Sequence, residues 1–173
     1  MKREYLIGAA IITSILLILS IAAHTATYFG IDPQVKFPAV WLLHFGIFIV
    51  FIPAFIAYRN EYGGRFGNID HESVMRRAPE WMRILLKVFI IYTAINFGLF
   101  FVNSEAGAPD IWEGQYVLQN KGTLIRELSQ DEYERYQMYE VRGFSGHWLI
   151  FYYYPLIAYY SILHKDDEEE VLD

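Results

Sequence analysis

The sequence contains no cysteine among its 173 residues. This absence excludes disulfide bonds, cysteine-ligated metal clusters, covalently attached c-type haem and thiol chemistry. Basic residues are also scarce: 14 lysines and arginines stand against 20 aspartates and glutamates, which gives a formal net charge of −6. They form no basic patch with interleaved aromatic residues, so we expect no nucleic-acid partner.

Catalytic motifs are missing as well. The sequence contains neither H-E-x-x-H, the motif of zinc proteases, nor Gly-x-Ser-x-Gly, the motif of serine hydrolases. The glycine-rich segment 63–67 lacks the Lys-Ser/Thr end of a phosphate-binding loop and a preceding soluble strand. The sequence therefore does not predict an enzyme.

Charged residues are absent from four long stretches, while 54% of all residues are apolar. About 20 mostly apolar residues suffice for a helix to cross a bilayer. We therefore predict an all-α integral membrane protein, in which a single domain (1–173) forms a bundle of four transmembrane helices. The third span includes Arg83 and Lys87, whose charged ends can reach the membrane interface. The predicted spans cover residues 5–29, 38–58, 82–103 and 144–164.

A secretory signal peptide is the alternative interpretation of the first stretch. The apolar core of such a peptide measures about 7–15 residues and ends at a small-x-small cleavage site. The apolar run from Leu6 to Ala23 is longer, and the following residues 24–27 offer no clean cleavage pattern. We therefore interpret this stretch as a membrane span.

Residues 105–142 separate the third and fourth predicted spans and form an extramembrane insert. Two strand-like runs, 115–119 and 123–128, flank Asn120-Lys121-Gly122, which predicts a small β-hairpin. The segment 129–132 reads Ser-Gln-Asp-Glu, matches a capping box and predicts an amphipathic helix with a stripe of tyrosines. This helix is expected to lie on the membrane surface or to lead directly into the fourth span.

The positive-inside rule orients the predicted bundle. With the N-terminus inside, nine lysines and arginines lie on the inner side and five on the outer side. We therefore predict a multi-pass membrane protein with cytoplasmic N- and C-termini and with the insert 105–142 on the outer side. Residues 165–173 are predicted to form a solvated acidic tail.

Three histidines are the candidate ligands. His24, His44 and His147 lie near the outer ends of three predicted spans, and a rise of about 1.5 Å per residue places them at one depth. Ionisable groups in a bilayer normally face the bundle interior. The three side chains therefore predict a transition-metal site, or a b-type haem held between two of them. The alternative is that each histidine is hydrogen-bonded or faces water, without a ligand.

Other polar residues are predicted to face the interior of the bundle, because their spacing places them along one side of a helix. These residues are Thr13, Ser20, Asn96 and Asn103. Hydroxyl and amide side chains in such positions more often serve helix packing than ligand binding. Pro53 and Pro155 lie well inside predicted spans and are expected to kink the helices.

These features predict a small polytopic membrane protein with a structural or accessory role in a membrane complex. Its expected partners are the lipid bilayer and either a second copy of itself or another membrane protein, docked on the insert. The first alternative is a redox subunit that binds haem or a metal through the three histidines. The second alternative is an oligomeric transporter or channel, favoured by the two proline-containing spans and a weak similarity between them.

Overall fold

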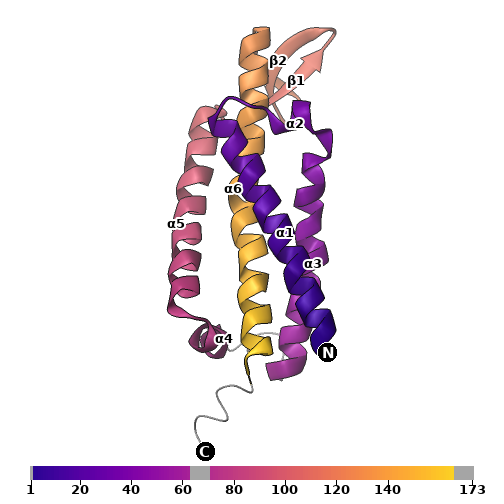
Figure 1. Cartoon of the computed structure of the whole chain (residues 1–173). Helices are drawn as coiled ribbons and strands as arrows, with labels where there is room; N and C mark the ends of the chain where they lie inside the picture. Colours follow the sequence, from indigo (N-terminus) through magenta and orange to yellow (C-terminus); the bar gives the residue numbers. More distant parts are fainter. Residues whose placement is uncertain (1, 63–70, 166–173) are drawn as a thin grey trace, which may run out of the picture.

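The long helices of the protein run side by side, and a small β-sheet lies at one end of them (Figure 1). The computed structural model describes residues 2–62 and 71–165. The beginning of the first helix and the end of the last one lie together at the end opposite the sheet. These two ends are named the sheet end and the terminal end below.

Three helices are long and apolar enough to cross a membrane. They are α1 (Arg3–Tyr28), α3 (Leu42–Tyr62) and α5 (Glu80–Asn103), and they correspond to the first three predicted spans. Their apolar residues are largely exposed, and in α5 only 11% of the most apolar part is buried inside the molecule. Such a surface supports membrane insertion, because lipid solvates exposed isoleucine and phenylalanine side chains that water does not.

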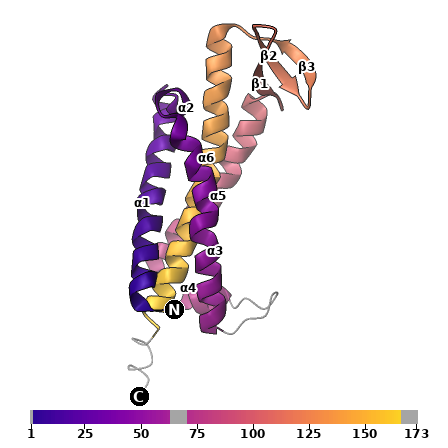
Figure 2. The same ribbon diagram turned by 90° about the vertical axis from the view of Figure 1, so that its right-hand side faces the viewer.

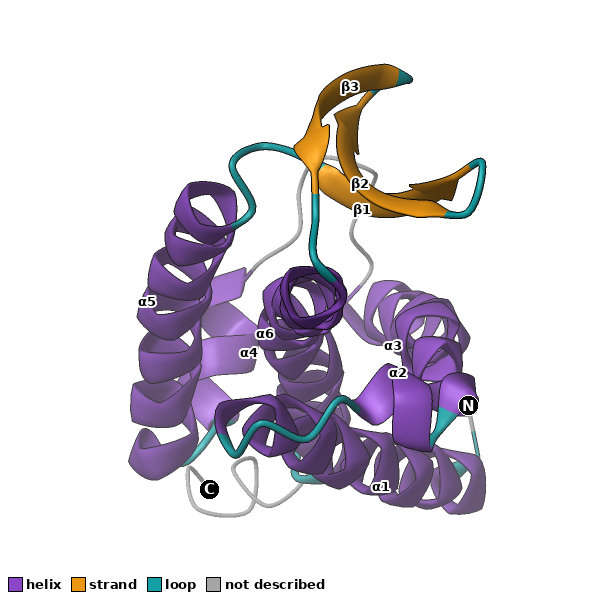
Figure 3. Cartoon of the chain, turned by 90° about the horizontal axis from the view of Figure 1, so that it is seen from above, coloured by secondary structure: helices purple, strands orange, loops and turns teal. Residues whose placement is uncertain are grey.

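The last helix, α6 (Gln130–Leu163), lies in the middle of the bundle. It has 34 residues, which corresponds to a length of about 50 Å. Helices α1, α3 and α5 all pack against it, and Figure 3 shows them on three of its sides. Several of the largest fully buried side chains belong to α6, among them Trp148, Tyr152 and Tyr159.

Three of the four predicted spans correspond to helices that are long and apolar enough to cross a membrane. Helix α6 is long enough but is not as apolar as this criterion requires. The predicted fourth span, 144–164, contains two histidines and five tyrosines. Because neighbouring helices cover α6, tyrosine hydroxyls are accommodated inside the bundle. Three of them donate hydrogen bonds to main-chain carbonyls of α3 and α5: Tyr152 to Leu43, Tyr153 to Met82 and Tyr159 to Val50.

The sheet has three antiparallel strands in the order β1-β2-β3: β1 (Ala108–Trp112), β2 (Gln115–Asn120) and β3 (Thr123–Glu127). The predicted hairpin corresponds to β2 and β3. Its two-residue turn uses Lys121 and Gly122, which both have positive φ as a type I′ turn requires. The sequence does not predict β1, because Ala-Pro-Asp at its start is more typical of a turn than of a strand. The prediction of a simple hairpin is therefore corrected to a three-stranded sheet.

Helix α6 begins at the predicted capping box. The N–H of Glu132 donates to the Ser129 hydroxyl, and the Glu132 carboxylate accepts from the Ser129 N–H. The amphipathic helix was expected either to lie on the membrane surface or to lead directly into the fourth predicted span. The structure has the second arrangement. Pro53 and Pro155 both lie inside helices that continue past them, α3 and α6.

Short helices complete the fold. At the sheet end, α2 (Pro33–Lys36) and the 3-10 helix η1 (Pro38–Trp41) connect α1 to α3. At the terminal end, α4 (His71–Arg77) packs against α6, as the side view in Figure 2 also shows. The predicted acidic tail, 165–173, lies outside the described residues except for Lys165.

Two glycines of α6 allow α5 to approach it closely. A Cβ atom on Gly146 would lie 2.1 Å from Nδ2 of Asn96, and one on Gly143 would lie 2.6 Å from the ring of Phe100. Neither position tolerates a side chain without moving its neighbour. Small residues have this role in membrane bundles generally, where close backbone approach replaces the hydrophobic effect as the source of helix association.

Candidate functional site

Three helices meet around His24, which is 5% exposed. Its Nδ1 lies 2.7 Å from Oγ of Ser145 on α6, and its Nε2 is hydrogen-bonded to the hydroxyl of Tyr92 on α5. The Tyr92 hydroxyl lies 2.9 Å from that of Tyr28 on α1. Both imidazole nitrogens thus have partners within the protein, so neither is available to a metal in this arrangement.

Arg142 of α6 extends this network to the end of α1. Its Nε donates to Oγ1 of Thr27 at 3.0 Å, and its Nη2 donates to the main-chain carbonyl of the same residue. The guanidinium also lies over the ring of Tyr28, 4.4 Å from the centroid, as in a cation–π contact. A cation at this place additionally opposes the partial negative charge at the C-terminal end of α1.

Helix α5 joins the network through two side chains that bond to the main chain of α6. Oγ1 of Thr93 donates to the carbonyl of Gly146, and Nδ2 of Asn96 donates to the carbonyl of Arg142, both at 3.0 Å. Interhelical hydrogen bonds of this kind contribute about 0.6–2 kcal/mol each in membranes. We name the connected set the polar layer: His24, Thr27, Tyr28, Tyr92, Thr93, Asn96, Arg142 and Ser145. Because its groups bond to one another, we interpret it as structural.

Three of the four residues predicted to face the bundle interior are buried: Thr13, Ser20 and Asn96. The hydroxyl oxygen of Ser20 has no hydrogen-bond partner among the described residues. Asn103 was expected to face the interior with Asn96, but it is exposed, because it is the last residue of α5 and lies at the end of the bundle. It lines the edge of a cavity of about 60 Å³ next to Arg142.

The other two histidines lie together on a different side of α6. The ring centroids of His44 and His147 are 6.0 Å apart, with the ring planes nearly perpendicular. Nε1 of Trp148 donates to Nδ1 of His44 at 3.1 Å. Ser145, which bonds His24, precedes His147 by two residues, or about 200° of rotation around the helix. This rotation explains why His24 does not reach the pair.

The structure therefore brings His44 and His147 together but not His24. Within residues 2–62 and 71–165, no group of three or more histidine, aspartate or glutamate side chains is placed to hold a metal ion. The indole N–H of Trp148 can only donate, so Nδ1 of His44 is the unprotonated nitrogen and the ring proton lies on Nε2. A protonated nitrogen cannot ligate a metal or a haem iron, but it can donate a hydrogen bond.

The histidine pair lies on the side of α6 between α3 and α5. Figure 3 shows these two helices on either side of α6. The position of the pair follows from the contacts of the Phe144 ring. Its centroid lies 5.7 Å from that of His44 on α3 and 6.2 Å from that of Phe100 on α5. Phe144 and Phe151 are both exposed there. Each of the other three sides of α6 is covered by one long helix.

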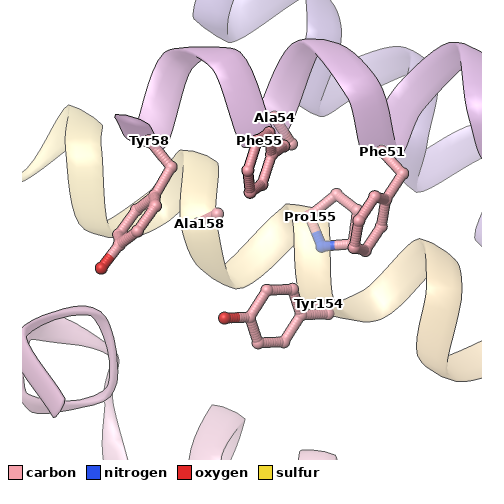
Figure 4. Close-up of a pocket in the computed structure, with 7 residues that line it drawn as sticks. All are labelled: Phe51, Ala54, Phe55, Tyr58, Tyr154, Pro155 and Ala158. Carbon is pink, nitrogen blue, oxygen red and sulfur yellow. The ribbon is translucent and has the colours of Figure 1, made fainter. Parts of the chain in front are cut away.

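A cavity of about 230 Å³ lies further along α6, between this helix and α3. Figure 4 shows its apolar lining, in which tyrosine hydroxyls are the only polar side-chain groups. The lining residues are Phe51, Ala54, Phe55, Tyr58, Tyr154, Pro155 and Ala158. Pro155, predicted from the sequence only as a kink, thus also forms part of a cavity wall.

A second polar cluster fastens the sheet to α6. Arg126 of β3 lies 2.9 Å from a carboxylate oxygen of Glu132 and 3.3 Å from one of Glu105, and it donates to the hydroxyl of Tyr136 at 3.1 Å. Tyr136 also donates to Glu105 at 2.6 Å. The hydrogen bonds from Tyr136 and Arg126 lower the pKa of the Glu105 carboxyl. We name these four residues the Arg126 cluster. No local sequence signal distinguishes Arg126 from the other basic residues of the insert.

Glu140 lies on α6 between the sheet and the histidine pair, one turn before Phe144. Burial raises the pKa of its carboxyl to about 7. The carboxyl makes no hydrogen bond or ion pair with any residue that the structure describes. The carboxyl therefore changes its charge near neutral pH. The sequence, in which Glu140 lies in a tyrosine-rich helix, did not predict this property.

Comparisons with known proteins reveal no relative: no family model, no curated protein and no solved structure matches the chain. The functional interpretation therefore rests on the geometry itself. That geometry comprises the structural polar layer, the histidine pair with the apolar cavity, and the sheet fastened to α6 by the Arg126 cluster.

Proposed function

We propose that the protein is a non-catalytic accessory subunit of a membrane complex, in which α6 is the fourth span of a four-helix transmembrane bundle. The sheet and the first turns of α6 form a docking platform on the outer side, and both termini lie in the cytoplasm. The nine basic residues on the inner side and five on the outer side support this orientation. The partner is a second copy of the chain or another membrane protein.

The observation that carries this proposal is the firm connection between the sheet and the bundle. Helix α6 continues from its cap at Ser129 to Leu163. The Arg126 cluster and an apolar cluster of Leu118, Leu128 and Tyr136 join the sheet to the beginning of this helix. A platform that is already ordered loses little conformational freedom when a partner binds, which favours a docking role.

The surface of the sheet has the composition of an interface. Ile111 of β1 and Leu124 of β3 are 51% and 48% exposed. Leu124 also lines a hollow together with Trp112, Val117 and polar residues that include Glu113, Gln115 and Glu127. Apolar and aromatic side chains at the centre with polar residues around them are typical of protein–protein interfaces.

The position of α6 supports its assignment as a span. A helix at the centre of a membrane bundle does not need an apolar surface all round, because neighbouring helices cover its polar groups. The tyrosine hydroxyls of α6 that donate to carbonyls of α3 and α5 illustrate this coverage. The central position thereby accounts for its lower hydropathy.

The geometry gives less support to the two alternatives. A haem or metal site is disfavoured because His24 bonds through both ring nitrogens and His44 carries its proton on the free nitrogen. An ion pathway through a single chain is disfavoured because the cavity between α3 and α6 is apolar. No structural observation specifically supports either alternative.

The docking role is tested with the full-length chain, cross-linked in native membranes and then sized in a mild detergent. The wild type is expected to form a complex larger than the monomer. The double variant Ile111→Ser/Leu124→Ser, which removes one exposed apolar side chain from each face of the sheet, is expected to lose that complex. Lys121→Ser, in the exposed β2–β3 turn, is the matched control and keeps it. A monomeric wild type, or a complex unchanged in the double variant, would contradict the proposal.

A further inference from the structure

A continuous row of aromatic rings follows the side of α6 between α3 and α5. From the His44–His147 pair it continues to Phe151, whose ring centroid is 6.1 Å from that of His147. Phe51 of α3 follows at 6.0 Å from Phe151 and lies 6.4 Å from Tyr154. Phe51 and Tyr154 line the cavity shown in Figure 4. We name this row, together with the cavity at its end, the aromatic lane.

The lane is accessible from the lipid. Phe144 and Phe151, which border it, are 36% and 41% exposed, although both belong to the central helix. The contacts of Phe144 with His44 of α3 and Phe100 of α5 place this side of α6 between those two helices. A molecule dissolved in the bilayer can therefore enter the lane sideways, without passing through the bundle.

One hydrogen-bond donor at the histidine end of the lane remains available. The bond from Trp148 to Nδ1 of His44 fixes the ring proton on Nε2. This N–H group makes no hydrogen bond with a residue in the described part of the chain. A donor in apolar surroundings is costly unless an acceptor meets it. The ligand that fits best therefore places a hydrogen-bond acceptor oxygen next to Nε2 of His44.

Apart from His147 and the hydroxyls of Tyr58 and Tyr154, the remainder of the lane presents apolar groups. The residues that form it include no lysine or arginine, so a phosphate head group would lack the cation that normally holds it. Flat rings pack well against the edges and faces of aromatic side chains. From His147 to Ala158 the lane extends for about 16 Å along α6, at 1.5 Å per residue.

We propose that the aromatic lane binds a membrane-dissolved quinone, a flat ring with carbonyl oxygens and an apolar tail. A carbonyl oxygen of the quinone accepts the hydrogen bond from Nε2 of His44. The ring lies against Phe144 and His147, and the tail passes Phe51 into the cavity of about 230 Å³. This binding is independent of the docking role of the sheet.

Titration of the purified full-length protein with a decyl-substituted benzoquinone tests the proposal. Quinones quench tryptophan fluorescence, and Trp148 lies beside the proposed ring position. We expect saturable quenching. His44→Phe keeps an aromatic ring but removes the N–H donor, so it should weaken binding about tenfold. His164→Phe, at the terminal end of α6, is the matched control and should bind like the wild type.

Two results would overturn the proposal. The first is quenching that does not saturate, or that saturates equally in the wild type and in His44→Phe. The second is displacement of the quinone by added phospholipid, seen as recovery of the tryptophan fluorescence, which would assign the lane to a lipid chain. Thermal unfolding of each variant in the same detergent verifies that it is folded.

A second variant keeps the test decisive if His44→Phe does not fold. Phe51→Trp enlarges the side chain between the histidine pair and the cavity, where the tail must pass. It should weaken binding of the decyl-substituted benzoquinone several-fold and leave that of a tail-less benzoquinone unchanged. An equal effect on both compounds, or no effect on either, contradicts the proposed position of the tail.

Discussion

At the scale of single residues, the polar groups of the bundle are distinguished by whether another residue satisfies them. His24 and Arg142 bond within the polar layer and hold α1 against α6. Glu140, on the same helix, is half-buried and has no such partner in the described chain. The first two therefore hold the helices together, whereas the third makes stability depend on pH.

The sign of that dependence follows from the raised pKa of Glu140. The carboxyl has a pKa of about 7 in the folded protein and an ordinary value of 4.5 when unfolded. The folded state therefore binds the proton more tightly, and stability falls as the pH rises from about 4.5 to about 7. Glu140→Gln should abolish this fall and raise the free energy of unfolding at pH 8 by about 2 kcal/mol.

Chemical unfolding in detergent between pH 4.5 and pH 8 measures the effect of Glu140→Gln. Glu134→Gln, at an exposed position one and a half turns earlier on α6, is the matched control and should leave the pH profile unchanged. A variant at position 140 with the wild-type profile would show that this carboxyl is not the responsible group.

At the scale of elements, the close contact between α5 and α6 depends on the absence of a side chain at two positions of α6. The carbonyls of this part of α6 accept hydrogen bonds from Thr93 and Asn96 only because the two helices approach so closely. The contact thus combines backbone approach with interhelical hydrogen bonding, and a single methyl group at Gly146 disrupts both.

Gly146→Ala is expected to destabilise the protein by about 1–3 kcal/mol, because the new methyl group would lie 2.1 Å from Nδ2 of Asn96. The thermal unfolding midpoint in detergent measures this loss. Gly98→Ala, on α5, provides the comparison, since a Cβ there meets nothing within 4 Å. It should be neutral or slightly stabilising, as alanine is the better helix former. Equal midpoints for the two variants would contradict the close-contact argument.

The elements also show what the sequence predicts and what it does not. Charge-free runs predict the three apolar helices, and turn and capping signals predict β2, β3 and the start of α6, because each depends on neighbouring residues only. Strand β1 depends on pairing with β2, which no local pattern reveals. The separation of His24 from the histidine pair has a similar cause: the helical rise predicts the depth of each residue in the bundle, but packing determines which side of α6 each neighbouring helix occupies.

At the scale of the whole molecule, the central question is how the chain lies in the membrane. If α5 spans the bilayer, helix α4 and the sheet, which precede and follow it in the order α4, α5, β1, are on opposite sides of the membrane. The chain contains no cysteine, so single cysteines introduced at chosen positions are unambiguous labels.

Lys121→Cys, in the β2–β3 turn, should react with a membrane-impermeant maleimide added to intact cells. Arg76→Cys, in α4, should react only after the membrane is permeabilised. Both positions are exposed, so a difference between them reports the side of the membrane. Labelling of both cysteines in intact cells, or of neither, would show that α5 does not cross the membrane and would thereby contradict the four-span topology.

The unbroken length of α6 has a mechanical consequence. Helix α6 is a stiff rod of about 50 Å, and three other helices pack against part of its length. It therefore moves as one rigid body and does not bend like a flexible linker. If the sheet is pulled or tilted, the strain is not absorbed at a flexible joint between sheet and bundle. It is transmitted to the opposite end, where Lys165 and Glu61 form an ion pair at 2.8 Å. If α6 spans the bilayer, as proposed, a displacement of the sheet on one face of the membrane changes the packing on the other face.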